Sequence, residues 1–369
     1  MSPTQELRKT PLNAVHRALG ARMVDFGGWD MPVQYSGIIE EHHAVRRGVG
    51  LFDVSHMGEV EITGRQAFDL VNHAATSAVS KMAEGQAQYA GLLYEHGGFV
   101  DDILIYKVTP EHYFLCVNAS NQEKDFEHIA ALRQSLGYDC RVEFTSPRYA
   151  QLAVQGPLAA AVVQQLTPVD LKTIRYYRFA DGEVMGLAAR IARTGYTGED
   201  CFELFVAPEH AGALWARVLE AGAGHGIKPC GLGARNTLRL EAGMALYGHE
   251  IGPDINPVEA GLLRNIDLNK EFTGRAAVVR CAEKGPSRKL CGLEMVGRGI
   301  ARDGYEIHVD GAAAGWVTSG GPSPTLNKNI ALCYLPAEAA VPGRTVQVMI
   351  RGQLVDAVTV NPPFYKRAK

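Results

Sequence analysis

The segment GGFVDDILIY (97–106) places two adjacent aspartates, Asp101 and Asp102, at the entrance to an apolar run. A carboxylate in such a place is costly to desolvate unless another group pairs with it or a reaction uses it. If the run is a strand, successive side chains point to opposite faces, so the two carboxylates cannot form an acid–base dyad. Asp102 would share its face with Leu104 and Tyr106, and the tyrosine hydroxyl makes this face the better wall for a ligand pocket.

A capped turn explains the same two aspartates without any ligand. Gly97 and Gly98 precede them, and aspartate side chains commonly accept hydrogen bonds from the free backbone N–H groups of a turn. The residues alone leave both interpretations open, and only the choice between the two aspartates is sharpened by the alternation of a strand.

A further carboxylate, Glu203, follows a glycine-framed turn in RTGYTGEDCFEL (193–204). Strand alternation puts Glu203 on the opposite face from its apolar neighbours Phe202 and Leu204. It therefore lies either on a solvated face or inside a pocket. Inside a pocket it suits a planar pair of N–H donors, because a carboxylate accepts two parallel hydrogen bonds well. Pterins and guanidinium groups both present such a pair.

Two arginines in GARNTLRLEAG (233–243) suggest an anionic partner. Arg235 and Arg239 are four residues apart, so on a helix they share one face and repel each other. A carboxylate of a small molecule would relieve that repulsion. Glu241 or another internal acid would relieve it equally well.

Several common catalytic motifs are absent. The sequence has no G-x-x-x-x-G-K-[ST], no G-x-G-x-x-G, no H-E-x-x-H and no G-x-S-x-G. The adjacent His42 and His43 would point in different directions from a helix, so they make a poor metal pair. The seven cysteines are scattered without a C-x-x-C, which argues against a disulfide framework and a zinc site. No metal site is predicted.

Composition narrows the class of protein further. The chain has 369 residues, a formal net charge of −3, 46% hydrophobic residues and 21% charged residues. This balance gives no basic domain for nucleic acid. The first twenty residues contain no apolar core typical of a signal peptide, and no apolar run reaches the length of a membrane span. We expect a soluble, cytoplasmic protein without nucleic-acid or membrane partners.

The elements that must position these residues alternate in type along the chain. Strands are predicted at 89–94 and 100–108, joined as a hairpin, and at 112–118; helices are predicted at 124–137 and 231–248. After about residue 285 the pattern changes to short strands with turn signals between them. This change indicates an α+β protein with a small all-β barrel or sandwich at its end.

Nine stretches carry a stronger signal together than any of them does alone. They are DFGGWDMPVQY (25–35), GLFDVSHMGEV (50–60), GGFVDDILIY (97–106), VNASNQEKD (117–125), QGP (155–157), RTGYTGED (193–200), GARNTLRLEAGMALYG (233–248), NPVEAGL (256–262) and GWVTSGGPSPTLNKNIAL (315–332). In this order and spacing, from about residue 20 to the end, the chain resembles the T-protein family of the glycine cleavage system, the folate-dependent aminomethyltransferases.

The resemblance implies an α+β fold of three domains, arranged as a cloverleaf around a central tetrahydrofolate channel. The implied domains are a discontinuous folate-binding domain at 1–50 plus 145–284, an inserted α+β domain at 51–144 that carries the catalytic aspartate, and a β-barrel domain at 285–369.

The resemblance also implies the reaction. An aminomethyl group on the dihydrolipoyl arm of H-protein gives its carbon to tetrahydrofolate as 5,10-methylenetetrahydrofolate, and ammonia leaves. Lipoylated H-protein is the expected partner, with P-protein and L-protein of the same system as indirect partners. The alternatives are a tetrahydrofolate-dependent demethylase of the same fold with a small methylated donor, and a non-catalytic folate-binding or iron–sulfur-assembly protein of this superfamily.

Site residues follow from the resemblance position by position. Asp102 would be the catalytic residue beside the reacting folate nitrogens, stabilising a cationic carbon and ordering the attacking nitrogen or acting as a general base. Glu203 would hold the pterin ring, and Arg235 would meet the acidic end of the folate or its carbonyl. The other residues expected to line the folate pocket are Met57, Tyr89, Tyr106, Asn118, Tyr177, Tyr196 and Tyr365.

Overall fold

The computed structural model describes residues 6–367. The chain folds into two compact units. The first unit comprises residues up to 67, 82–88 and 104–236; the second comprises 68–81, 89–103 and the residues from 237 onward. The helices of the described residues are α1 (Asn13–Ala18), α2 (Ile38–Arg47), α3 (Ala67–Ala74), α4 (Gln122–Leu136), α5 (Ala159–Val163), α6 (Ala211–Ala221), α7 (Leu232–Glu241) and α8 (Arg275–Lys284).

A six-stranded sheet in the first unit has the order β10-β11-β12-β9-β3-β13. Its strands are β3 (Gly50–Asp53), β9 (Ala150–Gln155), β10 (Phe179–Val184), β11 (Leu187–Ala192), β12 (Cys201–Val206) and β13 (Lys228–Pro229). Every residue of β3, β9 and β12 is buried. Apolar side chains of these strands pack with those of α5 and α6 into one core, so any polar side chain they carry must find its partners inside the protein. Strands β1 (Arg22–Phe26) and β2 (Trp29–Gln34) form a separate antiparallel hairpin in the same unit.

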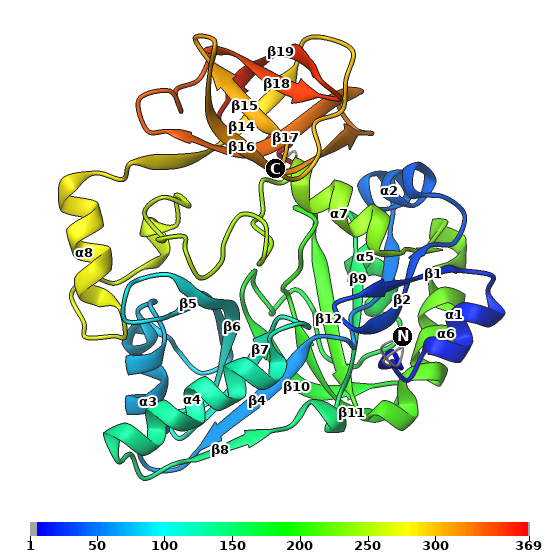
Figure 1. The fold of residues 1–369 in the computed structure, drawn as a ribbon. Helices are drawn as coiled ribbons and strands as arrows, with labels where there is room; N and C mark the ends of the chain where they lie inside the picture. The colour runs from blue at the N-terminus through cyan, green and yellow to red at the C-terminus, as the bar shows by residue number, and fades with distance from the viewer. Residues whose placement is uncertain (1–5, 368–369) are drawn as a thin grey trace. The chain divides into compact units, whose positions relative to one another are not determined.

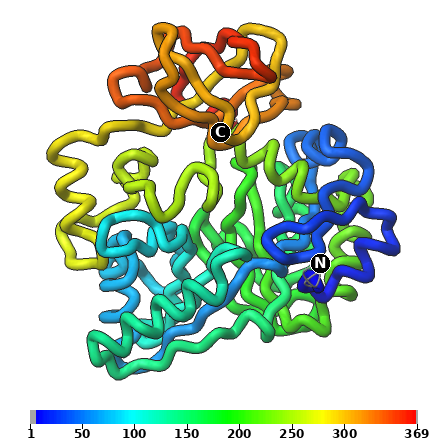
Figure 2. Tube along the Cα trace, viewed as in Figure 1, coloured from blue at the N-terminus to red at the C-terminus, as the bar shows by residue number. Residues whose placement is uncertain are grey.

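A five-stranded antiparallel sheet has the order β5-β6-β7-β4-β8. Its strands are β4 (Gly58–Thr63), β5 (Gln86–Leu93), β6 (Phe99–Thr109), β7 (His112–Val117) and β8 (Arg141–Phe144). The predicted hairpin is confirmed: the Gly97 N–H donates to the Tyr94 carbonyl at 2.8 Å, and the Tyr94 N–H donates to the Gly98 carbonyl at 2.9 Å. Figure 2 traces this hairpin as part of the cyan tube. The predicted helix at 124–137 is confirmed as α4, which ends at a left-handed Gly137.

The C-terminal strands close into a barrel of six in the order β14-β17-β16-β15-β18-β19, drawn in yellow-orange to red in Figure 1. They are β14 (Arg288–Met295), β15 (Glu306–Val309), β16 (Ala312–Ser323), β17 (Lys328–Pro336), β18 (Thr345–Ile350) and β19 (Gln353–Val360). Inward side chains of all six strands form a separate apolar core. The predicted α+β class and terminal β-barrel are therefore confirmed.

Helix α7 is shorter than the predicted helix over 231–248, and that prediction is corrected. Gly243 adopts a left-handed φ of 63°, which an L-residue rarely takes, and the Met244 N–H donates to the Arg239 carbonyl at 3.0 Å. These features end the helix at Glu241, although the apolar spacing continues beyond it.

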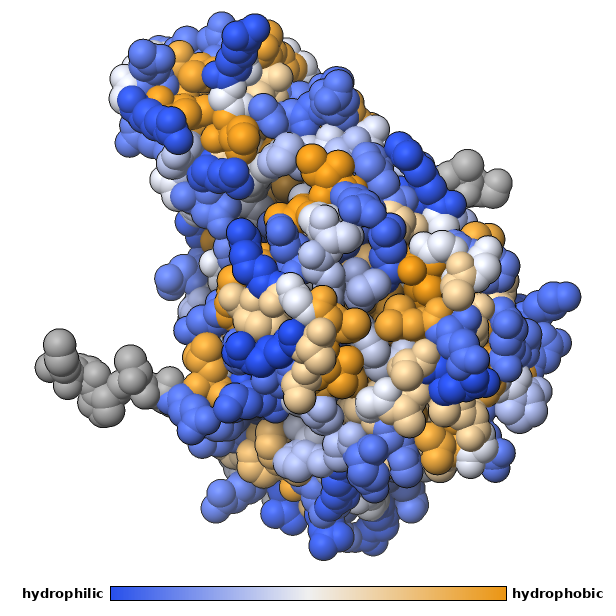
Figure 3. Space-filling view, turned by 90° about the vertical axis from the view of Figure 1, so that its right-hand side faces the viewer, coloured by the Kyte–Doolittle hydropathy of each residue, from blue (hydrophilic) through white to orange (hydrophobic). Residues whose placement is uncertain are grey.

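The division into three domains stays a prediction. The predicted domain ranges include residues 1–5 and 368–369, which lie outside the described part of the chain. The first twenty residues, in which no signal peptide is expected, also begin outside it. Between residues 6 and 367, no helix combines the length and apolar character needed to cross a bilayer. On the face drawn in Figure 3, hydrophobic residues are interspersed with hydrophilic ones.

Candidate active site

Asp101 and Asp102 both lie inside β6, beyond the turn that joins it to β5. Their side chains point to opposite faces of the strand. Asp101 is fully buried, whereas Asp102 and Leu104 are half-buried. In the second unit, the Tyr89 hydroxyl donates a hydrogen bond to Asp102 Oδ2 at 3.1 Å. The two carboxylates therefore have different surroundings, and the side chain of Asp102 is the more exposed of the two.

Glu203 is buried in the first unit, on the central strand β12, with only 7% of its surface exposed. Its Oε1 accepts a hydrogen bond from Gln151 Nε2 at 3.2 Å, and its Oε2 accepts a short one from Thr194 Oγ1. The solvated-face alternative for Glu203 is therefore wrong. Burial raises the pKa of Glu203, while the hydrogen bond from Thr194, the charge of Arg235 and the hydrogen bond from Gln151 act in the opposite direction.

Tyr106 reaches Glu203 through Thr194. The Tyr106 hydroxyl lies 3.3 Å from Thr194 Oγ1. Because Thr194 uses its single proton on Glu203, Tyr106 must donate to Thr194. Burial strongly raises the pKa of Tyr106, so the phenol stays protonated and keeps this role. We call Glu203, Gln151, Thr194 and Tyr106 the Glu203 cluster.

An aromatic core surrounds the Tyr106 side chain. The rings of Phe114, Phe179 and Phe205 contact it edge-on, with centroid distances of 5.5 to 5.9 Å. Two other residues predicted from the resemblance, Met57 and Tyr177, pack against the same core. The first unit thus brings Met57, Tyr106 and Tyr177 together around apolar surface.

Arg235 stacks its guanidinium group over the Tyr196 ring, 4.5 Å from the centroid. His56 lies near the same charge. Burial first, and the Arg235 charge second, lower the pKa of His56 to about 3, so this imidazole is neutral at physiological pH. His56 Nδ1 is buried and has no hydrogen-bond partner within residues 6–367.

Arg239 does not share the surroundings of Arg235. In the second unit it is buried and pairs with Glu250 at 2.8 Å, and it also donates to Ser319 Oγ at 2.7 Å. Its anionic partner is therefore an internal acid, as one of the two interpretations of the arginine pair proposed. Glu241 has other contacts, since it accepts from Ser323 Oγ at 2.5 Å.

The two remaining residues predicted to line the folate pocket are Asn118 and Tyr365. Asn118 directly follows β7 and is half-buried. In the second unit, the Tyr365 N–H donates to the Glu241 carbonyl at 2.8 Å, which ties the C-terminal segment to the end of α7. Within residues 6–367, no group of three or more His, Cys, Asp and Glu side chains is placed to hold a metal ion.

Sequence reasoning missed Gln151, Thr194 and His56. The amide of Gln151 and the hydroxyl of Thr194 carry no charge that would single them out, and the partner of Gln151 is Glu203, 52 residues further along the chain. For Thr194 there was one usable signal, since it directly precedes the glycine-framed turn before Glu203.

Comparisons with known proteins agree over nearly the whole chain. Residues 12–270 match the family model of the GCVT N-terminal domain, and residues 288–366 match that of the glycine cleavage T-protein C-terminal barrel domain. An aminomethyltransferase of Desulfitobacterium hafniense (strain DSM 10664 / DCB-2) is 51% identical over 98% of this chain and 99% of its own length. One from Acidobacterium capsulatum is 54% identical over 98% of this chain and 97% of its own length.

A solved structure gives the same result. The crystal structure of glycine cleavage system aminomethyltransferase T from Bartonella henselae superposes with a TM-score of 0.91, at 32% identity, over 98% of both chains. The match includes both the α+β part and the barrel. The chain belongs to the glycine cleavage T-protein family.

Proposed function

We propose that this protein transfers a one-carbon unit from aminomethylated, lipoylated H-protein to tetrahydrofolate with release of ammonia, the aminomethyltransferase step of the glycine cleavage system. The observation that carries the proposal is the family relationship over the whole chain, with relatives named aminomethyltransferases at 51% and 54% identity. P-protein and L-protein would act on the same H-protein and so be indirect partners.

The Glu203 cluster suits the pterin ring of tetrahydrofolate. Each oxygen of a carboxylate can accept two hydrogen bonds, and each oxygen of Glu203 accepts one within the described residues. One acceptor position on each oxygen can therefore meet a planar pair of N–H donors, which is what a pterin presents. The aromatic core beside Tyr106 supplies apolar surface close to the cluster.

Asp102 is the proposed catalytic residue. Tetrahydrofolate would supply the two nitrogens that bond to the carbon, while the carbon's bonds to ammonia and to the lipoyl sulfur break and the arm is left as a free thiol. Positive charge develops on that carbon as its bond to the departing ammonia breaks, and a fixed carboxylate stabilises such charge. The Tyr89 hydroxyl at 3.1 Å restrains Asp102 in one orientation, so little reorganisation is needed during the reaction.

Arg235 is proposed to bind the acidic end of the folate or its carbonyl. Its stacking on Tyr196 orients the planar guanidinium group, and a guanidinium presents its N–H donors as a fork that suits a carboxylate. The remaining residues proposed to contact the folate are Met57, Tyr106, Asn118, Tyr177, Tyr196 and Tyr365. We further propose the three domains at 1–50 plus 145–284, 51–144 and 285–369 as the organisation that carries these residues.

The donor is the test that separates this function from a demethylase of the same fold. With saturating tetrahydrofolate, we expect methylenetetrahydrofolate and ammonia from aminomethylated H-protein, and no detectable transfer from N-methylglycine or a methylated sulfonium compound. Coupled spectrophotometric assay of the folate product measures all three donors. Faster turnover with a small methylated donor than with H-protein would support the demethylase instead.

A further inference from the structure

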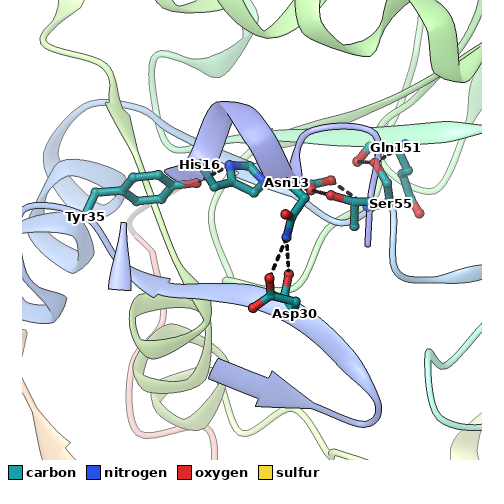
Figure 4. A network of polar contacts seen from close by, with 8 residues as sticks. Asn13, His16, Asp30, Tyr35, Ser55 and Gln151 are labelled. Carbon is teal, nitrogen blue, oxygen red and sulfur yellow. Dashed lines mark hydrogen bonds and ion pairs between the residues drawn. The ribbon is translucent and has the colours of Figure 1, made fainter. Parts of the chain in front are cut away.

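A buried polar network in the first unit is connected to the Glu203 cluster through Gln151. Asp53, at the end of β3, accepts hydrogen bonds on Oδ2 from Thr10 Oγ1 at 2.6 Å and from His16 Nε2 at 2.9 Å. The other ring nitrogen of His16 pairs with the Tyr35 hydroxyl at 2.8 Å (Figure 4). The ring of Trp215 covers His16 edge-on, and the side chains of His16 and Asp53 are both fully buried.

Ser55 connects this network to strand β9. The Ser55 N–H donates to Asp53 Oδ1 at 2.9 Å, which fixes the residue in place. The Ser55 hydroxyl accepts from the Gln151 N–H at 3.0 Å and donates to the Gln151 carbonyl at 3.2 Å (Figure 4). The ladder between β3 and β9 ends with the pair Asp53 and Leu152. The Val54 N–H also donates to the Gln151 carbonyl, at 3.0 Å, so Val54 and Ser55 together extend the bonding of β9 by one residue beyond that ladder.

The Gln151 side chain then reaches Glu203 across the sheet. Gln151 is opposite Phe205 and Glu203 is opposite Ala153 in the pairing of β9 with β12, so Gln151 and Glu203 are diagonal neighbours within reach of long side chains. A carboxylate only accepts, so the amide must present its Nε2 to Glu203. Its oxygen then faces the Cys116 thiol, at 3.8 Å.

Two donors on two different oxygens restrain the Glu203 carboxylate more than one would. The terminal torsion of a glutamate has a broad energy profile, so a single hydrogen bond leaves the plane of the carboxylate free to turn. Thr194, in the loop before β12, holds one oxygen, and Gln151 of β9 holds the other. A bidentate contact with a planar ligand needs that plane to be fixed.

We propose that Gln151 is a positioning residue for substrate recognition: its backbone is tied through Ser55 to the buried Asp53–His16 pair, and its carboxamide fixes the plane in which Glu203 meets the N–H donors of the ligand. The inference rests on the proposed function, because it takes the pterin ring as the group that Glu203 binds.

The ionised form of Glu203 is the acceptor in this arrangement. Among the described residues, the ionisable groups that face it are Arg235 of α7 and Tyr106 of β6, with Cys116 of β7 behind Gln151. The charge of Arg235 lowers the pKa of Glu203, and burial raises the pKa of Tyr106, so this phenol stays protonated. Loss of the Gln151 donor leaves Thr194 and Arg235 in place, so at neutral pH binding should weaken without being abolished. As the pH falls, binding should be lost at a higher pH than in the unchanged protein.

Gln151→Met keeps the length of the side chain and removes its donor. By equilibrium titration of the full-length protein with tetrahydrofolate under anaerobic conditions, we expect Kd at neutral pH to rise about five- to tenfold. The acid midpoint, below which binding is lost, should move upward by about one pH unit. Gln151→Glu keeps size and polarity and sets a second carboxyl beside Glu203, so the midpoint should move upward further. Gln165→Met, the same change at an exposed amide, should alter neither quantity.

The two hypotheses fail in different ways. If Glu203→Ala binds tetrahydrofolate as the unchanged protein does, the proposed pterin contact is wrong whatever Gln151 does. If Glu203→Ala weakens binding but both Gln151 variants keep Kd and the acid midpoint, the positioning role alone is refuted. A rise in Kd with no shift of the midpoint would reduce Gln151 to a packing residue and would also overturn the inference. Titration of the ligand itself is common to every variant and cancels in the comparison.

Discussion

Asp102→Asn is expected to lower kcat by about 10²- to 10³-fold, while the Kd for tetrahydrofolate stays within about threefold of the unchanged protein. The substitution keeps the shape of the side chain and removes the negative charge that the proposed reaction uses only as positive charge develops on the transferred carbon. The half-buried Asp102 contacts Tyr89, and an amide oxygen can still accept that hydrogen bond. Single-turnover kinetics and an equilibrium folate titration measure the two quantities separately.

Asp101→Asn is the matched control, since it makes the same change at the neighbouring position on the opposite face of β6. Asp101 is fully buried, so this variant can lose stability, and its activity must be expressed per folded molecule. We expect that corrected activity to be close to normal. If Asp101→Asn loses turnover and Asp102→Asn does not, the catalytic assignment is wrong.

Glu203→Gln is expected to raise the Kd for tetrahydrofolate by about 10- to 100-fold, because hydrogen bonds to a charged group contribute about 1.5–3 kcal/mol. The amide also presents an NH₂ group where the carboxylate offers only acceptors, so it opposes both the ligand and the Gln151 donor. At saturating folate, kcat should fall much less than KM rises, which distinguishes a binding residue from a catalytic one.

Glu209→Gln provides the control for Glu203, since it makes the same change at an exposed position shortly after β12. Its Kd should not change. Isothermal titration calorimetry of both variants with tetrahydrofolate measures the two Kd values. An unchanged affinity in Glu203→Gln would refute the pterin contact.

Much of the fold could be predicted because its signals are local. The hairpin of β5 and β6 and the short strands after residue 285 follow from apolar runs and turn residues, which act over a few positions. The end of α7 could not be predicted from the same pattern. The residues after Glu241 keep helical spacing, and the chain leaves the helix because Gly243 takes a left-handed conformation.

In the candidate site, too, only the features that depend on local sequence could be predicted. Strand alternation alone separates Asp101 from Asp102, because side-chain direction in a strand depends only on position. The choice between a solvated and a buried Glu203 could not be made, since it depends on β12 lying in the middle of a sheet with β9 and β11 as neighbours. Gln151 could not be predicted for the same reason. Its role depends on being a diagonal neighbour of Glu203 on the adjacent strand, about fifty residues away in the sequence.

The partner of Arg239 shows a further limit of sequence reasoning. Helical spacing correctly grouped Arg235 and Arg239 on one helix, but the two side chains have different environments. Arg239 is satisfied by Glu250 and Ser319, whereas Arg235 stacks on Tyr196. The pairing with Glu250 excludes Arg239 as a folate-binding candidate, and the resemblance to the T-protein family had selected Arg235 for reasons that spacing could not supply.

Stoichiometry in a single turnover tests the central claim most directly. The protein is mixed with aminomethylated H-protein of known loading, with and without tetrahydrofolate, and ammonia and methylenetetrahydrofolate are both measured. The proposed function predicts one ammonia and one methylenetetrahydrofolate for each aminomethyl group consumed, and a rate that depends on tetrahydrofolate. No ammonia from H-protein, or ammonia without formation of methylenetetrahydrofolate, would contradict it.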